Sequence, residues 1–269
     1  MRESDITVVI PARDAAAVLP ATLGALAGAD VVVVDNGSRD DTAAVALAHG
    51  ARVVHEPRAN RARARNAGAK ATSAPLLAFL DADCVPSERW LAALTEALAD
   101  AELAAGPVEW RSRRRPNRIE RFDVAWRTHA RRTGGFSGSG NLAVRREAFD
   151  RLGGFDPAFR AAGEDSDLAR RAGSAVRFVP DAVVAHAAER SVRGLVARGF
   201  RHGEANVQMR RRFGPDAGRA YWRHPKPLVA GDWAIRRFGI DDRSLLPVAR
   251  LDYAARMAGS LWATARRVR

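Results

Sequence analysis

The first hundred residues alternate between short apolar runs and alanine-rich segments. The apolar runs, rich in valine and leucine, are Ile6–Ile10, Val31–Val34, Ala51–Val54 and Leu76–Leu80. Segments with helical spacing follow them, at Val18–Ala27, Thr42–Ala48, Arg61–Ala71 and Trp90–Ala99. Continuous apolar strands separated by helices are typical of a parallel sheet that helices cover on both faces. The sequence therefore predicts a Rossmann-like α/β fold, with a mostly parallel central sheet and right-handed crossovers.

The pattern changes after residue 103. Residues 104–111 are predicted to form one more strand, which is followed by a segment with nine arginines and the glycine-rich stretch GGFSGSGN. Further short strands are expected at residues 142–145 and within residues 174–187. Beyond residue 187 the chain is predicted to be helical, at Val192–Phe213 and Leu245–Val268.

Basic residues are concentrated near the C-terminus. Residues 188–269 hold 18 Lys and Arg against 7 Asp and Glu, whereas residues 1–187 hold 26 against 24. This asymmetry indicates an anionic partner, such as a lipid surface, a phosphorylated substrate or nucleic acid, unless the arginines only fill solvated faces. The single cysteine, Cys84, excludes an intramolecular disulfide and fits a reducing compartment. With neither a signal peptide nor a membrane-spanning stretch in the sequence, we expect a cytoplasmic protein or one peripheral to the inner face of the membrane.

Carboxylates stand at the ends of two of the apolar runs. Asp35 follows the second run, and the pair Asp81 and Asp83 follows the fourth. In an open α/β sheet the carboxyl ends of the strands line the ligand crevice. Two aspartates one residue apart at such a point can offer hard oxygen ligands to Mg²⁺ or Mn²⁺. The alternative is local, since Asp83 or Ser87 can cap the helix that begins near Trp90.

Three further features carry candidate chemistry. The stretch GEDSD places Glu164 and Asp165 before a helix, where a carboxylate can act as a general base or be favoured by the helix dipole alone. His186 ends an apolar run, either as a structural residue or as a metal ligand. Four arginines lie between Arg58 and Arg65 at a helix start, where cations oppose the dipole. A bound diphosphate would account for them, and so would plain solvation.

These pieces together resemble the glycosyltransferases of family 2, which have the GT-A fold. The matching stretches lie in the family's order over roughly residues 5–187; they are VVIPARD, VVVVDNGSRDDT, NRARARNAG, FLDADC, GSGNLAVRREAFDRLGGFD, GEDSDLARR and PDAVVAH. Each stretch alone is weakly specific, and the seven in order carry the resemblance. It implies a GT-A catalytic domain over residues 1–187, with a nucleotide-binding half (1–103) and an acceptor and catalytic half (104–187). Residues 188–269 would form a basic helical extension that contacts a membrane or a partner, or only packs on the domain.

The resemblance also implies which residues bind the donor. Pro11 and Arg13 would lie beside the nucleoside on the first loop. Asp35 would accept a hydrogen bond from the base, typically from N3–H of uracil. Arg65, together with Arg61, would face the diphosphate or the ribose.

Metal-binding and catalytic positions follow from the resemblance in the same way. Asp83 would be the principal ligand of Mn²⁺ or Mg²⁺, with Asp81 on the ribose or the metal and His186 as a further metal ligand. Asp165 would be the catalytic base, and Glu164 would lie on the acceptor side. Cys84 is interpreted as a packing residue.

The glycine-rich stretch adds a candidate site residue, and two other positions depart from the usual sequence of the family. The glycine-rich stretch at residues 134–141 would be a loop near the donor sugar, with Asn141 as a sugar contact, or else a flexible connection. The first loop reads PARD where the family often has an aromatic residue followed by Asn-Glu, and Asn36 stands where a second Asp is frequent. These departures bear on the choice of base and sugar.

The implied activity is inverting transfer of a sugar from a nucleotide-sugar, with UDP-sugar favoured, to a hydroxyl of a glycan or lipid-linked acceptor of the cell envelope. One rival is a basic nucleic-acid-binding protein. It leaves the aspartates unexplained, since without a metal they repel phosphates, and we expect no nucleic-acid partner. The other rival is a metal-dependent phosphoryl-transfer or nucleotidyl-transfer enzyme. Such an enzyme would need an aspartate nucleophile or a glycine-rich basic loop after the first strand, where this chain reads IPARD.

Overall fold

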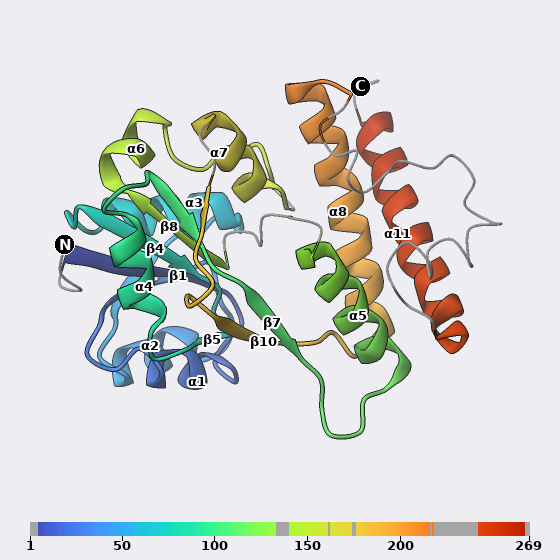
Figure 1. Cartoon of the computed structure of the whole chain (residues 1–269), viewed down its shortest axis with the longest axis horizontal. Coiled ribbons are helices and arrows are strands. Elements are labelled where there is room, and N and C mark those ends of the chain that lie inside the picture. Colours follow the sequence, from blue (N-terminus) through green and yellow to red (C-terminus); the bar gives the residue numbers. More distant parts are fainter. Residues whose placement is uncertain are drawn as a thin grey trace. The chain divides into compact units, whose positions relative to one another are not determined.

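The computed structural model describes residues 5–132, 140–160, 162–173, 176–215, 217 and 242–266. The chain divides into two compact units (Figure 1). The first comprises residues 1–109, 136–160 and 164–186, and the second comprises residues 110–135, 161–163 and 187–269.

A seven-stranded sheet forms the centre of the first unit, in the order β3-β2-β1-β4-β8-β6-β9. The strands are β1 (Ile6–Ala12), β2 (Asp30–Asp35), β3 (Arg52–His55), β4 (Leu76–Leu80), β6 (Leu103–Ala105), β8 (Asn141–Arg145) and β9 (Arg177–Phe178). Strands β3, β2, β1 and β4 are parallel, and β8 is antiparallel to both of its neighbours. The prediction of an α/β fold with a mostly parallel sheet is therefore confirmed.

Six helices belong to this unit in the described residues. They are α1 (Leu19–Gly24), α2 (Thr42–Ala48), α3 (Arg61–Lys70), α4 (Trp90–Ala97), α6 (Arg146–Arg151) and α7 (Glu164–Ala172). The core joins β1, β2, β4 and β8 to small residues of α3 and to an aromatic cluster of Phe79, Phe149 and Phe155. Gly68 lets α3 approach closely, because a Cβ atom there would lie 2.3 Å from Cγ1 of Val9.

The prediction of a single strand over residues 104–111 is wrong in one respect. The structure has two strands here, β6 and β7 (Val108–Arg111), separated by Gly106 and Pro107. Proline has no N–H to donate to a ladder. A Cβ atom at Gly106 would lie 1.8 Å from the carbonyl oxygen of Ala182. The chain therefore leaves the large sheet at this point.

β7 belongs to a second sheet, of three strands in the order β5-β10-β7. Its other strands are β5 (Cys84–Pro86) and β10 (Val184–Ala187), which are antiparallel to each other. In their register His186 stands opposite Cys84. This pairing brings His186 beside Asp83, which follows β4.

The second unit is helical in its described part. It contains α5 (Arg118–Arg132), α8 (Val192–Phe213), a short 3₁₀ turn at Arg243–Leu245, and α11 (Leu246–Ala265). The helices α8 and α11 confirm the expected helical C-terminal region. They pack closely, because a Cβ atom at Gly203 would lie 2.1 Å from the carbonyl oxygen of Arg256. None of the helices in the described ranges is both long and apolar enough to cross a membrane.

Charged side chains are buried where the helices of this unit meet. Arg198 pairs with Asp123 (2.6 Å), Arg127 with Asp123 (2.8 Å), and Arg256 with Asp252. The pKa of Arg127 is lowered to about 10, because burial disfavours its charge more than Asp123 favours it. We interpret the network as structural, since each of its carboxylates has an arginine partner.

Candidate active site

The candidate site lies at the carboxyl ends of β1, β2, β3 and β4. The order of strands reverses between β1 and β4, because β2 and β3 extend the sheet on one side of β1 and β4 lies on the other. Ligands of open α/β sheets bind in the crevice at such a switch point. Asp35 ends β2, His55 ends β3, and Asp81 follows β4 directly.

Asp35 is held by groups on both sides of its carboxylate. The N–H of Ser38 donates to Oδ1 at 3.0 Å, and Nδ1 of His55 lies 3.2 Å from Oδ2. Burial raises the pKa of Asp35, but the hydrogen bonds from Ser38 and the nearby His55 outweigh it, so the pKa falls below its ordinary value. Asp35 is therefore ionised and can accept a further hydrogen bond from a ligand.

The loop after β1 is fastened to the loop after β2. Asp14 has a left-handed backbone (φ 49), and its carboxylate accepts the N–H of Arg39 at 2.8 Å. The N–H of Asp14 in turn donates to the hydroxyl of Ser38 at 3.1 Å. Pro11 is half-buried and lies within β1, not on the loop that the sequence predicts for it, whereas Arg13 is exposed directly after the strand. These bonds fix the loop beside Asp35, where the sequence predicts the nucleoside.

Arg65 joins two candidate regions from the buried face of α3. Its Nη2 donates to Oδ1 of Asp81 at 2.7 Å, and its Nη1 donates to Oε1 of Glu164 at 2.6 Å. Arg65 is 1% exposed, and its Nε has no hydrogen-bond partner in the described part of the chain. Burial disfavours the charge of Arg65, but Asp81 and Glu164 outweigh it and raise its pKa. A fixed guanidinium thus connects the end of β4 to the start of α7.

This placement differs from the role that the sequence predicts for Arg65 and Glu164. Both terminal nitrogens of Arg65 are engaged with carboxylates, so facing a diphosphate stays a prediction. Burial raises the pKa of Glu164, although Arg65 opposes the shift. Glu164 is 4% exposed, which leaves it little surface for an acceptor. Arg61, in contrast, is exposed at the start of α3. Its charge opposes the rise in the pKa of Glu164 and adds to the lowering of the pKa of Asp83 by His186.

Asp83 and His186 lie together. Nε2 of His186 is 3.3 Å from Oδ2 of Asp83, and the buried sulfur of Cys84 completes a group whose possible ligand atoms all lie within 4.8 Å of one another. Burial raises the pKa of Asp83, but the hydrogen bond and charge of His186 outweigh it and lower the pKa. The helix α4 has no side-chain cap, so the capping alternative for Asp83 does not hold.

The donors of this group fit a divalent cation. A carboxylate oxygen suits Mg²⁺ and Mn²⁺, whereas a neutral imidazole suits transition metals better than Mg²⁺. The Cys84 thiol is a soft ligand that neither ion favours, so its interpretation as a packing residue stays in place. Asp81 is not a member of the group, and its Oδ1 is engaged by Arg65.

Asp165 lies in the first turn of α7, directly after Glu164. Its side chain is half-buried, and its Oδ1 accepts the N–H of Ser166 at 2.6 Å. Neighbouring residues of a helix point in different directions. Glu164 makes the ion pair with Arg65, and Asp165 also interacts electrostatically with Arg65. The start of α7 thus separates a buried carboxylate from a more accessible one.

Asn141 lies at the start of β8 with its side chain fully buried. Its amide donates to the carbonyl oxygens of Pro107 (3.1 Å) and Ala182 (2.7 Å), and its oxygen accepts from the indole of Trp90 (2.8 Å). These bonds leave the amide no donor for a sugar unless one of them breaks. Residues 134–139 of the glycine-rich stretch lie outside the described residues.

Sequence reasoning missed His55 and the double ion pair of Arg65. The position of His55 could have been found, because it directly follows the third predicted strand and therefore lies at the same edge as Asp35. The partners of Arg65 carry no sequence signal, since Glu164 lies 99 residues away along the chain.

Comparison with known proteins places this geometry in a family context. Residues 7–153 match the sequence profile described as Glycosyl transferase family 2. An uncharacterised glycosyltransferase of Mycobacterium tuberculosis is 49% identical over 79 residues, which are 29% of this chain and 36% of that protein. The pre-mycofactocin glycosyltransferase of the same organism is 32% identical over 216 residues, covering 72% of this chain and 45% of that protein. The chain thus spans less than half the length of these two relatives.

Solved structures show the same fold. Glucosyl-3-phosphoglycerate synthase from Mycobacterium tuberculosis, in complex with Mn²⁺, uridine diphosphate and glucosyl-3-phosphoglycerate, matches with a TM-score of 0.57 and 26% identity. The match covers 79% of this chain and 81% of that one. The same enzyme has also been solved with Mg²⁺ and uridine diphosphate, and that structure matches with a TM-score of 0.56.

Proposed function

The chain belongs to Glycosyl transferase family 2, and from this premise we propose that it transfers a sugar from a UDP-sugar to an acceptor hydroxyl, with inversion at the anomeric carbon and with Mn²⁺ or Mg²⁺. The observation that carries the proposal is the double ion pair of Arg65, which holds Asp81 at the donor edge and Glu164 beside the proposed base. The family match displaces both rivals, the nucleic-acid-binding protein and the phosphoryl-transfer or nucleotidyl-transfer enzyme.

We assign the donor to the carboxyl edge of the sheet. The base lies against Asp35 beside Pro11 and Arg13, with the N3–H of uracil donating to the Asp35 carboxylate. Arg61, exposed at the start of α3, reaches the diphosphate as a charge-assisted donor. Support comes from the solved relative, whose structures contain uridine diphosphate with Mn²⁺ or Mg²⁺.

Asp165 acts as the general base in this proposal. Its carboxylate takes the proton of the acceptor hydroxyl while the oxygen forms a bond to the anomeric carbon. The bond from that carbon to the diphosphate breaks on the opposite face, and its electron pair leaves with the diphosphate. Asp83 and His186 would hold the cation, and a divalent cation bound there would supply positive charge against the negative charge of the diphosphate. Arg65 positions Asp81 and the start of α7.

A nucleotide-sugar screen tests the proposed activity. We expect UDP-sugars, rather than GDP-sugars or dTDP-sugars, to raise the melting temperature of the protein and to be hydrolysed slowly, both only with Mn²⁺ or Mg²⁺ present.

Asp83→Ala should weaken metal-dependent donor binding about tenfold or more, as for removal of an orienting group at a metal site. Asp100→Ala, an exposed carboxylate elsewhere in the unit, serves as the control. No response to any nucleotide-sugar would refute the assignment.

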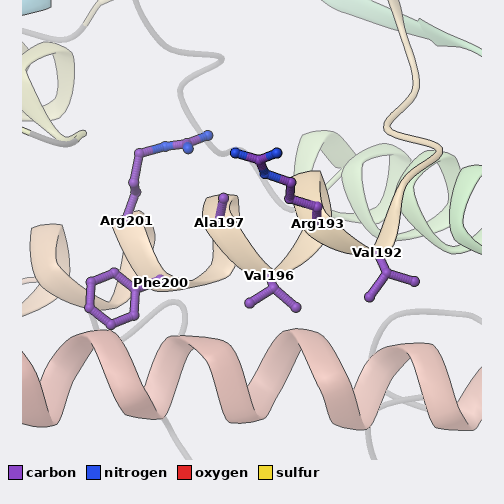
Figure 2. A pocket seen from close by; sticks show the side chains of 6 residues that line it. All are labelled: Val192, Arg193, Val196, Ala197, Phe200 and Arg201. Carbon is purple, nitrogen blue, oxygen red and sulfur yellow. The ribbon is translucent and has the colours of Figure 1, made fainter.

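For the acceptor we propose a lipid-linked glycan at an anionic membrane surface. The support is a hollow of about 760 Å³ on α8 in the second unit. Figure 2 shows Val192, Val196 and Phe200 on one side of the helix and Arg193 and Arg201 on the other. Apolar side chains beside arginines are the pattern by which helices bind anionic lipid surfaces.

Vesicle sedimentation tests this part of the proposal. The protein should bind phosphatidylcholine vesicles that contain phosphatidylglycerol, and high salt should release it, because each arginine near the surface contributes about 1 kcal/mol. Val192→Asp should weaken binding, since this side chain is 56% exposed. Leu47→Asp, at a position 61% exposed in the first unit, is the matched control. Equal binding to neutral vesicles, or none to either kind, would contradict the proposal.

A further inference from the structure

His55 is a candidate base-recognition residue that the proposed chemistry does not use. It ends β3, and its partner in the strand register is Asp35, which ends β2. The register also places Asp35 opposite Ala12, the last residue of β1. Three adjacent parallel strands therefore present Ala12, Asp35 and His55 in a row along the carboxyl edge of the sheet.

The contact between the two side chains fixes the orientation of the imidazole. Nδ1 of His55 lies 3.2 Å from Oδ2 of Asp35. An ionised carboxylate only accepts hydrogen bonds, so Nδ1 carries the proton in this pair. The His55 side chain is 69% exposed and that of Asp35 is 13% exposed. Within the described residues Nε2 has no hydrogen-bond partner, and the exposed part of the ring can meet a ligand.

The two residues together match the edge of a pyrimidine that carries an N–H between carbonyl groups. Asp35 can accept the N–H, while the neighbouring carbonyl needs a donor. Nε2–H supplies that donor when the imidazole carries a proton on both nitrogens. The amide of Asn36 cannot do so, because it donates to the carbonyl oxygens of Glu56 (2.9 Å) and Arg58 (2.7 Å).

We propose that His55 is a specificity-determining residue of the donor site, which donates from Nε2 to the base carbonyl next to the N–H that Asp35 accepts. This inference rests on the proposed function, since it assumes a donor nucleotide at this edge of the sheet. It adds a second contact to the base of the proposed UDP-sugar, since the N3–H of uracil is flanked by carbonyls.

Titration calorimetry with UDP and Mn²⁺ tests the inference on the intact chain. His55→Phe keeps a planar ring but has no donor, so UDP should bind roughly fivefold to tenfold more weakly, as for an exposed hydrogen bond that involves a charged group. His55→Gln keeps an amide donor and should retain part of the affinity. The affinity for inorganic pyrophosphate with Mn²⁺ should be unchanged in both variants. The control is His49→Gln, an exposed histidine whose Nδ1 lies 2.9 Å from the Val45 carbonyl oxygen.

The same substitution in an Asp35→Ala protein separates a direct contact of His55 with the base from an effect of His55 on the orientation of Asp35. His55→Phe should weaken UDP binding further in an Asp35→Ala protein, because a direct contact does not need the carboxylate. No further loss in that background would make His55 a positioning residue and overturn the inference. Unchanged UDP affinity in His55→Phe, or an equal loss for pyrophosphate, would also overturn it. If the parent protein binds no UDP at all, the proposed function itself fails, which is a different result.

Discussion

Asp165→Asn is expected to lower kcat by roughly 10²- to 10⁴-fold, the usual contribution of a positioned general base. Donor binding should change by less than about twofold, because the proposed base touches the acceptor hydroxyl and not the nucleotide. The loss should therefore appear in kcat and not in the Kd for UDP.

Folding should survive this substitution. Asp165 is half-buried, and its carboxylate accepts the N–H of Ser166 at 2.6 Å, which an asparagine oxygen can also do. A melting temperature within a few degrees of the parent would show that lost turnover is not lost structure. Steady-state kinetics and calorimetry on the same preparation provide the measurement.

Glu164→Gln is the matched comparison for Asp165→Asn. It removes a carboxylate one residue away, while an amide oxygen can still accept from Nη1 of Arg65. We expect Glu164→Gln to keep more turnover than Asp165→Asn. The opposite order would exchange the roles of the two residues, and wild-type turnover in Asp165→Asn would exclude it as the base.

Much of the fold follows from local patterns in the sequence. Four apolar runs predict β1, β2, β3 and β4. In β1, β2 and β4 the apolar run is continuous because both faces of the strand are buried. The helix α5 was not predicted, since the nine arginines around it obscure the apolar stripe. That stripe contains Phe122 and Trp126, which are buried in the core of the second unit. The four-residue spacing of Phe122 and Trp126 fits one face of a helix.

The candidate site was predictable only in part, for a physical reason. The carboxyl ends of parallel strands share one edge, so Asp35, Asp81 and Asp83 could be assigned to a crevice from the strand order. Contacts between buried side chains, in contrast, do not follow from the strand order. The resemblance implies that Arg65 faces the diphosphate or the ribose, whereas its burial depends on two carboxylates elsewhere in the sequence.

Arg65 contacts both parts of the proposed site, Asp81 on the donor side and Glu164 next to the proposed base. Breaking a buried ion pair by removing one partner leaves an uncompensated charge, at a cost of about 3–5 kcal/mol. Arg65→Met preserves most of the side-chain length and leaves the buried Glu164 without its cation. We expect the free energy of unfolding to fall by about that amount, measured by urea denaturation. Arg52→Met, whose salt bridge to Asp30 is half exposed, is the control and should cost under about 1 kcal/mol.

The pH dependence of this loss has a defined sign. Burial raises the pKa of Glu164 above its ordinary value of 4.5, and Arg65 opposes the rise. Without Arg65 the pKa of Glu164 rises further, so the folded protein takes up a proton more readily than the unfolded chain. The penalty in Arg65→Met should be largest above the raised pKa of Glu164 and should shrink as the pH falls through it towards 4.5.

A second substitution shows whether the ion pair itself is responsible. Adding Glu164→Gln to Arg65→Met removes the unpaired charge and should restore part of the stability, a coupling that a double-mutant cycle measures. Turnover should stay low in the double variant, because neither Asp81 nor the start of α7 is then held by a guanidinium. Additive losses would show that the pair with Glu164 is not responsible, and that Arg65 contributes through Asp81 and through packing against Phe155, whose ring centroid lies 5.6 Å from Cζ of Arg65. Full activity in Arg65→Met would show that the positions of Asp81 and Asp165 do not depend on this side chain.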